Sequence, residues 1–156
     1  MKTSITTKLI LFVAVAAALL SAQPASAIQR QQATNWCWAA CIQDVARDDG
    51  IRLSQSEIVT RLYGSRQDSP ASVQHVMQLL QSYNVGAHIA TRPPATEQEL
   101  YGSLSEGYRF IALIYPQGGP VGHFVVISGF NRSGALILED PIDGSTQYVH
   151  PQQVLG

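Results

Sequence analysis

The chain has 156 residues and a formal net charge of −1 at pH 7, with 10 basic and 11 acidic residues. This near balance of charge gives no support for binding to nucleic acid or to an anionic membrane surface. The chain is long enough for one domain with its own hydrophobic core.

The first 27 residues are typical of a signal peptide. Lys2 and Lys8 form a basic start, residues 9–20 are an unbroken apolar run, and Ala-Ser-Ala at 25–27 fits the cleavage rule. Twelve apolar residues are too few for a permanent membrane helix, so we expect export without a membrane anchor, to the periplasm or the medium. Cleavage would leave one domain, residues 28–156, with 8 basic and 11 acidic residues.

The next stretch, residues 31–41, contains a candidate nucleophile. Asn35 is a favoured N-cap and no helix breaker follows until Gly50, so we expect a helix with Cys37 in its first turn. Free backbone N–H groups and the positive end of the helix dipole favour a thiolate there. Gln31 lies six residues earlier, and its amide can donate to a developing oxyanion. The alternative is an inert cysteine in an apolar helix.

This segment resembles the nucleophile segment of papain-like cysteine peptidases. In that family a Gln side chain and the backbone N–H of the Cys form the oxyanion hole, and a Trp follows the Cys, as Trp38 follows Cys37 here. Asn35 and Trp36 replace the Cys-Gly-Ser lead-in of papain. A Trp directly before the nucleophile is more similar to small bacterial members, the staphopains and the avirulence-type peptidases of plant pathogens. The resemblance implies catalytic roles for Cys37 and Gln31.

The second cysteine, Cys41, lies four residues after Cys37 and therefore on the same helix face. Parallel Cβ vectors on one helix are poor disulfide geometry, and a bond would consume the proposed nucleophile. We therefore expect two free thiols, with Cys41 buried and structural.

Three capping signals predict three further helices. These are expected from the Ser-Gln-Ser-Glu box at 54–57 to Gly64, from the Ser-Pro pair at 69–70 to Asn84, and from the Thr-Glu-Gln-Glu box at 96–99 to Gly107. Residues 85–91 are expected to form a short strand, and four longer strands are expected at 108–115, 123–130, 135–140 and 146–150. Helices first and an antiparallel sheet last predict the α+β class, which is also the layout of the papain fold.

His123 is the histidine that opens a strand directly after a glycine-rich turn, and it resembles the histidine segment of papain-like peptidases. If the turn at 131–134 pairs Phe130 with Ala135, Asp140 lies opposite Val125. His123 and Asp140 then share one face of the sheet as diagonal neighbours, roughly 7–8 Å apart at the backbone. From there Asp140 can accept a hydrogen bond from one imidazole nitrogen.

The role of Asp140 depends on this register, because a slip of one residue would turn it to the other face. An Asp-Pro turn at the end of a strand is the alternative explanation. Glu139 faces away in the predicted register and Asp143 belongs to a turn, so both are poorer candidates. Papain uses Asn in this role, whereas Asp140-Pro141 resembles the avirulence-type enzymes and the bacteriocin-leader peptidases.

Together these features predict an exported cysteine peptidase. Cys37 attacks the scissile carbonyl, His123 transfers the proton, Asp140 orients His123, and Gln31 with the Cys37 backbone N–H holds the oxyanion. His123 follows Cys37 by 86 residues, where papain-type enzymes have roughly 130–150, so this would be a minimal version. We expect no metal or cofactor, because the histidines are scattered and Cys37-x3-Cys41 has no partner pair.

Other functions fit the same residues. These are a cell-wall amidase or a transglutaminase-like enzyme, a non-catalytic exported binding module, and a toxin that acts on a host. The expected partner is a protein or peptide substrate, and the expected state is a monomer. Residues 28–36 span at most roughly 30 Å, too little for an inhibitory propeptide domain. Restraint is therefore expected from narrow specificity, a separate inhibitor, a host activator, or oxidation of Cys37.

Overall fold

The computed structural model describes residues 8–16, 27–89, 94–115 and 121–155. Its helices are α1 (Cys37–Asp48), α2 (Gln55–Tyr63), α3 (Val73–Ser82), α4 (Glu97–Ser105) and α5 (Gln152–Leu155). Its strands are β1 (Lys8–Ala16), β2 (Ala87–Ile89), β3 (Tyr108–Tyr115), β4 (His123–Phe130), β5 (Leu136–Asp140) and β6 (Ser145–Val149). These strands form one sheet in the order β2-β1-β3-β4-β5-β6, and each neighbouring pair is antiparallel.

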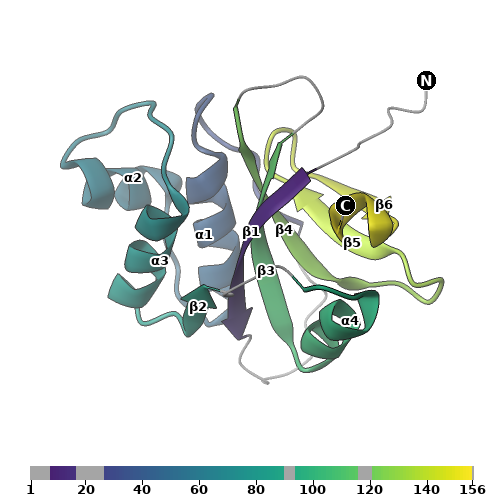
Figure 1. Cartoon of the computed structure of the whole chain (residues 1–156). Helices are drawn as coiled ribbons and strands as arrows, with labels where there is room; N and C mark the ends of the chain where they lie inside the picture. Colours follow the sequence, from purple (N-terminus) through teal and green to yellow (C-terminus); the bar gives the residue numbers. More distant parts are fainter. Residues whose placement is uncertain (1–7, 17–26, 90–93, 116–120, 156) are drawn as a thin grey trace.

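The sheet separates two groups of helices (Figure 1), with α1, α2 and α3 on one side and α4 on the other. Successive residues of a strand point to opposite faces. Phe124 and Val126 of β4 therefore belong to the core shared with α1–α3, whereas Val125 and Ile127 belong to the core shared with α4 and α5. This arrangement confirms the predicted α+β class.

The central part of the predicted signal peptide forms strand β1. It pairs with β3 on one side and with β2 on the other. Residues 1–7 and 17–26, which include the predicted cleavage region up to residue 26, lie outside the described residues. Cleavage after residue 27 therefore stays a prediction. No helix among the described residues is long and apolar enough to cross a bilayer.

The four C-terminal strands begin and end within one residue of their predicted bounds, and β2 lies inside the predicted short strand. Helix α2 has the predicted capping box, in which Ser54 and Glu57 bond each other's backbone N–H, and it ends at Gly64 in the left-handed region (φ 75°). Helix α5 was not predicted. Its four residues are too few to give a periodic pattern.

Helix α3 begins later than predicted, and the reason lies in the two tryptophans at the start of α1, the N-cap Trp36 and Trp38. Its N-cap is Ser72, not Ser69. The carbonyl groups of Gln67 and Ser69 accept hydrogen bonds from the indole N–H groups of Trp36 (2.9 Å) and Trp38 (3.0 Å). The segment 67–70 is thereby held as a loop against the start of α1.

A buried ionic cluster joins α1 to the sheet. Arg109 of β3 donates to Asp44 (2.7 Å) and Asp48 of α1 and to Glu139 of β5 (3.4 Å). The side chains of Asp44 and Glu139 are 0% and 3% exposed. Burial raises the pKa of Asp44 from 3.8 to about 6, although the charge of Arg109 opposes this rise. The cluster fixes α1 against the strand that ends at Asp140.

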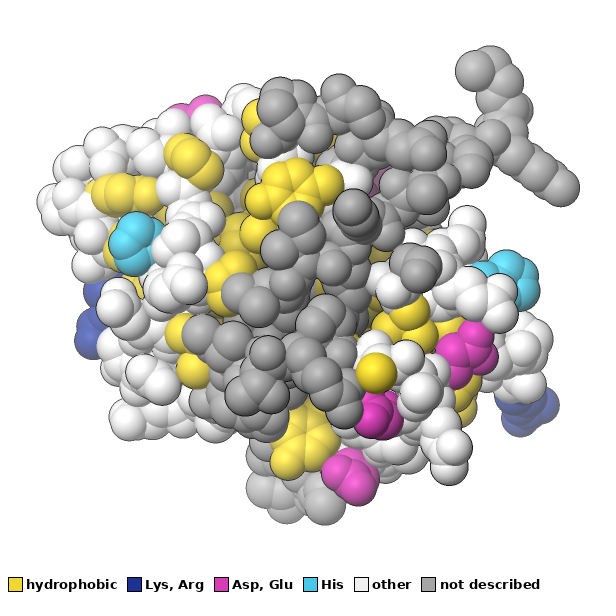
Figure 2. Space-filling model, viewed as in Figure 1, with side chains coloured by type: hydrophobic (Ala, Val, Ile, Leu, Met, Phe, Trp, Pro, Cys, Tyr) yellow, Lys and Arg dark blue, Asp and Glu magenta, His cyan; other side chains and the backbone are white. Residues whose placement is uncertain are grey.

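Few described Lys and Arg side chains are visible on the face shown in Figure 2. Among the described residues on the face shown in Figure 2, the Lys and Arg side chains lie far apart at the left and right edges. Hydrophobic side chains gather in a band between them. On this face the described residues therefore form no basic patch of the kind that binds nucleic acid.

Candidate active site

Cys37 is the first residue of α1. The predicted N-cap, Asn35, is wrong by one residue: the N-cap is Trp36, and no side chain caps the helix. Asn35 instead gives its backbone N–H to a carboxylate oxygen of Asp68 (2.7 Å), which holds it outside the helix. Among the described residues the N–H of Cys37 has no hydrogen-bond partner. A free N–H at the positive end of a helix is suited to receive an oxyanion.

The register between β4 and β5 decides whether Asp140 can reach the histidine. Phe130 pairs with Leu136, one residue beyond the predicted partner. A bulge in β4 before Gly129 takes up the extra residue, so that Val126 pairs with Glu139, as the predicted register requires. The pairing of β4 with β5 near His123 and Asp140 is therefore the predicted one, although the pairing next to the turn at 131–134 is not.

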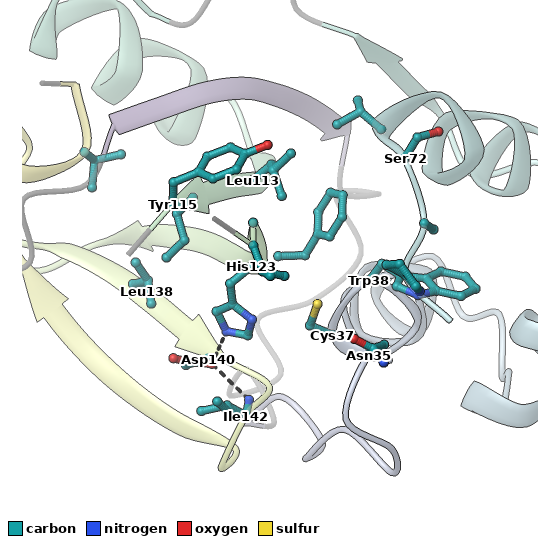
Figure 3. A pocket seen from close by; sticks show the side chains of 18 of the residues that line it. Asn35, Cys37, Trp38, Ser72, Leu113, Tyr115, His123, Leu138, Asp140 and Ile142 are labelled. Carbon is teal, nitrogen blue, oxygen red and sulfur yellow. Dashed lines mark hydrogen bonds and ion pairs between the residues drawn. The ribbon is translucent and has the colours of Figure 1, made fainter. Parts of the chain in front are cut away.

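His123 and Asp140 are in direct contact (Figure 3), with 2.7 Å between His123 Nε2 and Asp140 Oδ1. The same carboxylate oxygen accepts the backbone N–H of Ile142 (2.9 Å), which fixes the carboxylate after the strand ends. Cys37 points toward the imidazole from the other side. Because Nε2 is bonded to Asp140, Nδ1 is the ring nitrogen that remains for the thiol.

The environment of His123 favours its charged form. Burial alone would lower its pKa, but the hydrogen bonds to Asp140 and to Cys37, together with their charges, raise it from 6.5 to about 9. An imidazolium at neutral pH can hold a thiolate beside it and can later donate a proton. The three side chains together can therefore carry out nucleophilic acyl transfer.

The three residues lie in a cavity of about 810 Å³. Its described lining is mostly apolar, and the charged side chains in it are those of His123 and Asp140. The apolar lining comes from α1, from the start of α3 and the loop before it, from β3 and β4, and from the C-terminal strands, the turn between them and α5. It includes Trp38, Pro70, Val73, Leu113, Ile114, Tyr115, Phe124, Leu138, Ile142, Val149 and Val154. Sequence analysis did not predict this wall, because its residues are separated by up to 116 positions and only the fold brings them together.

Gln31 is close to the site in the chain but does not line the described cavity. Its side-chain Nε2 donates to the carbonyl groups of Ala33 (2.9 Å) and Thr34 (2.6 Å). Its Oε1 is buried and has no partner among the described residues. The amide must therefore turn away from these carbonyl groups before it can donate to an oxyanion.

Cys41 lies one turn further along α1. Both cysteines are free thiols, and Cys41 is fully buried. Burial, with a smaller effect from neighbouring acidic groups, raises the pKa of the Cys41 thiol well above 9.0. This environment makes Cys41 a poor nucleophile. Among the described residues no three His, Cys, Asp or Glu side chains gather where they could hold a metal ion.

A cysteine at the start of a helix, facing a histidine on an antiparallel sheet, is the arrangement of papain-like cysteine peptidases. The chain belongs to the Peptidase_C39 like family, whose model matches residues 25–153. It is also 28% identical over 128 residues to a curated relative from Escherichia coli O1:K1:H7, named Cysteine protease effector 1. The matched region is 82% of this chain and 24% of that relative, so the chain spans about a quarter of the relative's length.

Proposed function

We propose that the chain is an exported cysteine peptidase that hydrolyses peptide bonds in protein substrates. The observation that carries this proposal is His123, which lies between Asp140 and Cys37 in an apolar cavity and has its pKa raised to about 9. The mostly apolar lining, in which His123 and Asp140 are the charged side chains, supports an extended, mostly apolar stretch of polypeptide as the bound segment. A relative whose name joins "cysteine protease" and "effector" supports protein substrates and export.

In the proposed mechanism, Cys37 Sγ attacks the scissile carbonyl carbon, and the carbonyl electron pair moves to its oxygen. The Cys37 N–H stabilises that oxyanion, and the Gln31 amide joins it after turning. His123 then gives its proton to the leaving amine as the C–N bond breaks, which leaves a thioester on Cys37. Water, deprotonated by His123, hydrolyses the thioester and restores the thiol. Asp140 keeps the imidazole oriented throughout.

The test is covalent labelling and hydrolysis with a matched pair of cysteine variants. A peptidyl vinyl sulfone should add one mass increment to the wild-type chain at Cys37, and the chain should cleave casein. Cys37→Ala should abolish both, whereas Cys41→Ala should keep both and lose at most a few kcal/mol of stability. Full hydrolysis by Cys37→Ala would refute the mechanism.

The same experiment separates the alternative functions. Cleavage of peptidoglycan but not casein would indicate a cell-wall amidase, and no labelling at all would indicate a binding module. A chain made directly as residues 28–156 should be as active as the chain that results when the full-length protein is cleaved after residue 27. Activity that appears only after a further cut within residues 28–156 would contradict this.

A further inference from the structure

Gln55 is a buried polar residue that the mechanism above does not use. It is the first residue of α2, it is 0% exposed, and it is not among the residues that line the cavity. A side-chain amide in an apolar interior is retained only if its donors and acceptor are satisfied. The hydrogen-bond partners of Gln55 therefore indicate which part of the chain it fixes in place.

The three hydrogen bonds of the Gln55 amide go to the backbone on either side of Gln31 and to α1. Its Oε1 accepts the backbone N–H of Gln32 (2.8 Å), and its Nε2 donates to the backbone carbonyl of Arg30 (3.0 Å). The amide thus pairs with residues 30 and 32 as a neighbouring β-strand would, on both sides of Gln31. Its remaining N–H goes to Gln43 Oε1 of α1 (3.1 Å).

Gln31 itself is bonded from the opposite side. Its backbone N–H donates to the carbonyl of Pro141 (2.7 Å), the residue that follows Asp140. The backbone of Gln31 is therefore held between Gln55 and the turn that follows Asp140. None of these bonds involves the side chain of Gln31, whose amide donates instead to the carbonyl groups of Ala33 and Thr34.

We propose that Gln55 is a positioning residue, which fixes the Arg30–Gln32 backbone so that the Gln31 amide can reach the oxyanion formed at Cys37. This inference rests on the proposed peptidase function. A donor displaced by about 1 Å can cost on the order of 100-fold in rate, and loss of one oxyanion donor costs on the order of 100- to 1,000-fold in kcat. Gln55 acts on the rate only through Gln31.

The test uses Gln55→Met, which keeps the length of the side chain and removes its hydrogen bonds, in the full-length chain. We expect kcat for a peptide substrate to fall at least about tenfold with little change in KM, because an oxyanion donor acts mainly in the transition state. Alkylation of Cys37 by iodoacetamide forms no oxyanion, so its rate should stay within about twofold of the wild type. The matched control is Gln43→Met, which removes the bonds of Gln43 to Gln55 and to the Leu53 carbonyl (2.8 Å) but leaves the bonds of Gln55 to residues 30 and 32.

A double variant distinguishes positioning from general disturbance. Gln31→Ala/Gln55→Met should be no slower than Gln31→Ala alone, because Gln55 acts through Gln31. The inference would be overturned if the rate losses of the two single variants multiply in the double variant. It would also be overturned if the alkylation rate of Gln55→Met falls in parallel with its kcat, or if Gln55→Met keeps the wild-type kcat. A wild-type chain that hydrolyses nothing would instead overturn the proposed function, and this inference with it.

If Gln55→Met does not fold, Gln55→Glu gives a second test. A carboxylate can still accept from Gln32 but faces the oxygens of Arg30 and Gln43 without a proton to donate. Protonation restores one donor, so the kcat of the variant relative to wild type should rise as the pH is lowered. A ratio that stays constant, or falls, overturns the inference.

Discussion

Removal of Arg109 should destabilise the chain strongly, and the size of the effect follows from its buried partners. Arg109 is 8% exposed and donates to three carboxylates, of which those of Asp44 and Glu139 are 0% and 3% exposed. Breaking a buried ion pair by deleting one partner costs about 3–5 kcal/mol, because the remaining charge has no compensation. We therefore expect Arg109→Met to lose about 3–5 kcal/mol at pH 7.

The stability loss in Arg109→Met should depend on pH, and the pKa of Asp44 gives the direction of that dependence. Asp44 is an acid with a pKa of about 6 in the folded chain against 3.8 in model peptides, so between these values the folded state binds more protons than the unfolded state. Its contribution to stability therefore falls as pH rises through this window, by on the order of 3 kcal/mol in total at about 1.4 kcal/mol per pKa unit. Without Arg109 the buried carboxylates should hold protons to higher pH. The loss in Arg109→Met should then be larger at pH 7 than at pH 4.5.

Urea unfolding at pH 4.5 and 7, followed by tryptophan fluorescence, measures these losses of stability. It is applied to the wild-type chain, to Arg109→Met and to a control variant. The control is Arg47→Met, which removes a partly exposed partner of Asp44 and should cost less than about 1 kcal/mol. A loss below about 1 kcal/mol in Arg109→Met at pH 7 would refute the reasoning. An equal loss at both pH values would attribute the effect to packing and not to charge.

Three further predictions concern the site. Asp140→Asn should keep part of the hydrolytic rate, because an amide oxygen can still accept from the imidazole, whereas Asp140→Ala should lose most of it. Equal wild-type rates in both variants would remove Asp140 from the mechanism. His123 should titrate by NMR near pH 9, and its pKa should drop in Asp140→Ala, where the hydrogen bond that raises it is missing. As a base with a raised pKa, His123 contributes stability that is complete below pH 6.5 and lost by about pH 9, on the order of 3 kcal/mol. His123→Gln should flatten that slope, and an unchanged slope would contradict the assignment.

The sequence predicted those features that depend on local pattern. Strand bounds follow from alternation and glycine turns, and the start of α2 follows from a side chain that bonds its own backbone. The approach of His123 to Asp140 could also be predicted, because cross-strand register converts a distance along the chain into a distance in space. That prediction needed the bulge before Gly129 to offset a wrong turn pairing.

The features that sequence analysis missed depend on contacts between distant segments. Asn35 is a good cap by type, but Asp68, 33 residues away, takes its backbone N–H. Gln55 reads as the second residue of a capping box, and nothing in the local pattern shows that its amide turns inward to residues 30 and 32. Arg109 lies near the start of an apolar strand, and its acidic partners lie on α1 and β5.

Because β1 lies inside the sheet, the predicted cleavage after residue 27 would change the sheet itself. Among the described strands, β2 pairs only with β1, and β1 is one of the two neighbours of β3. A cut after residue 27 would therefore remove one strand, release a second and turn β3 from an interior strand into an edge. Leu113, Ile114 and Tyr115 of this edge line the cavity. The processed chain would then present unpaired backbone groups beside its own active site, where an extended polypeptide could align as an added strand.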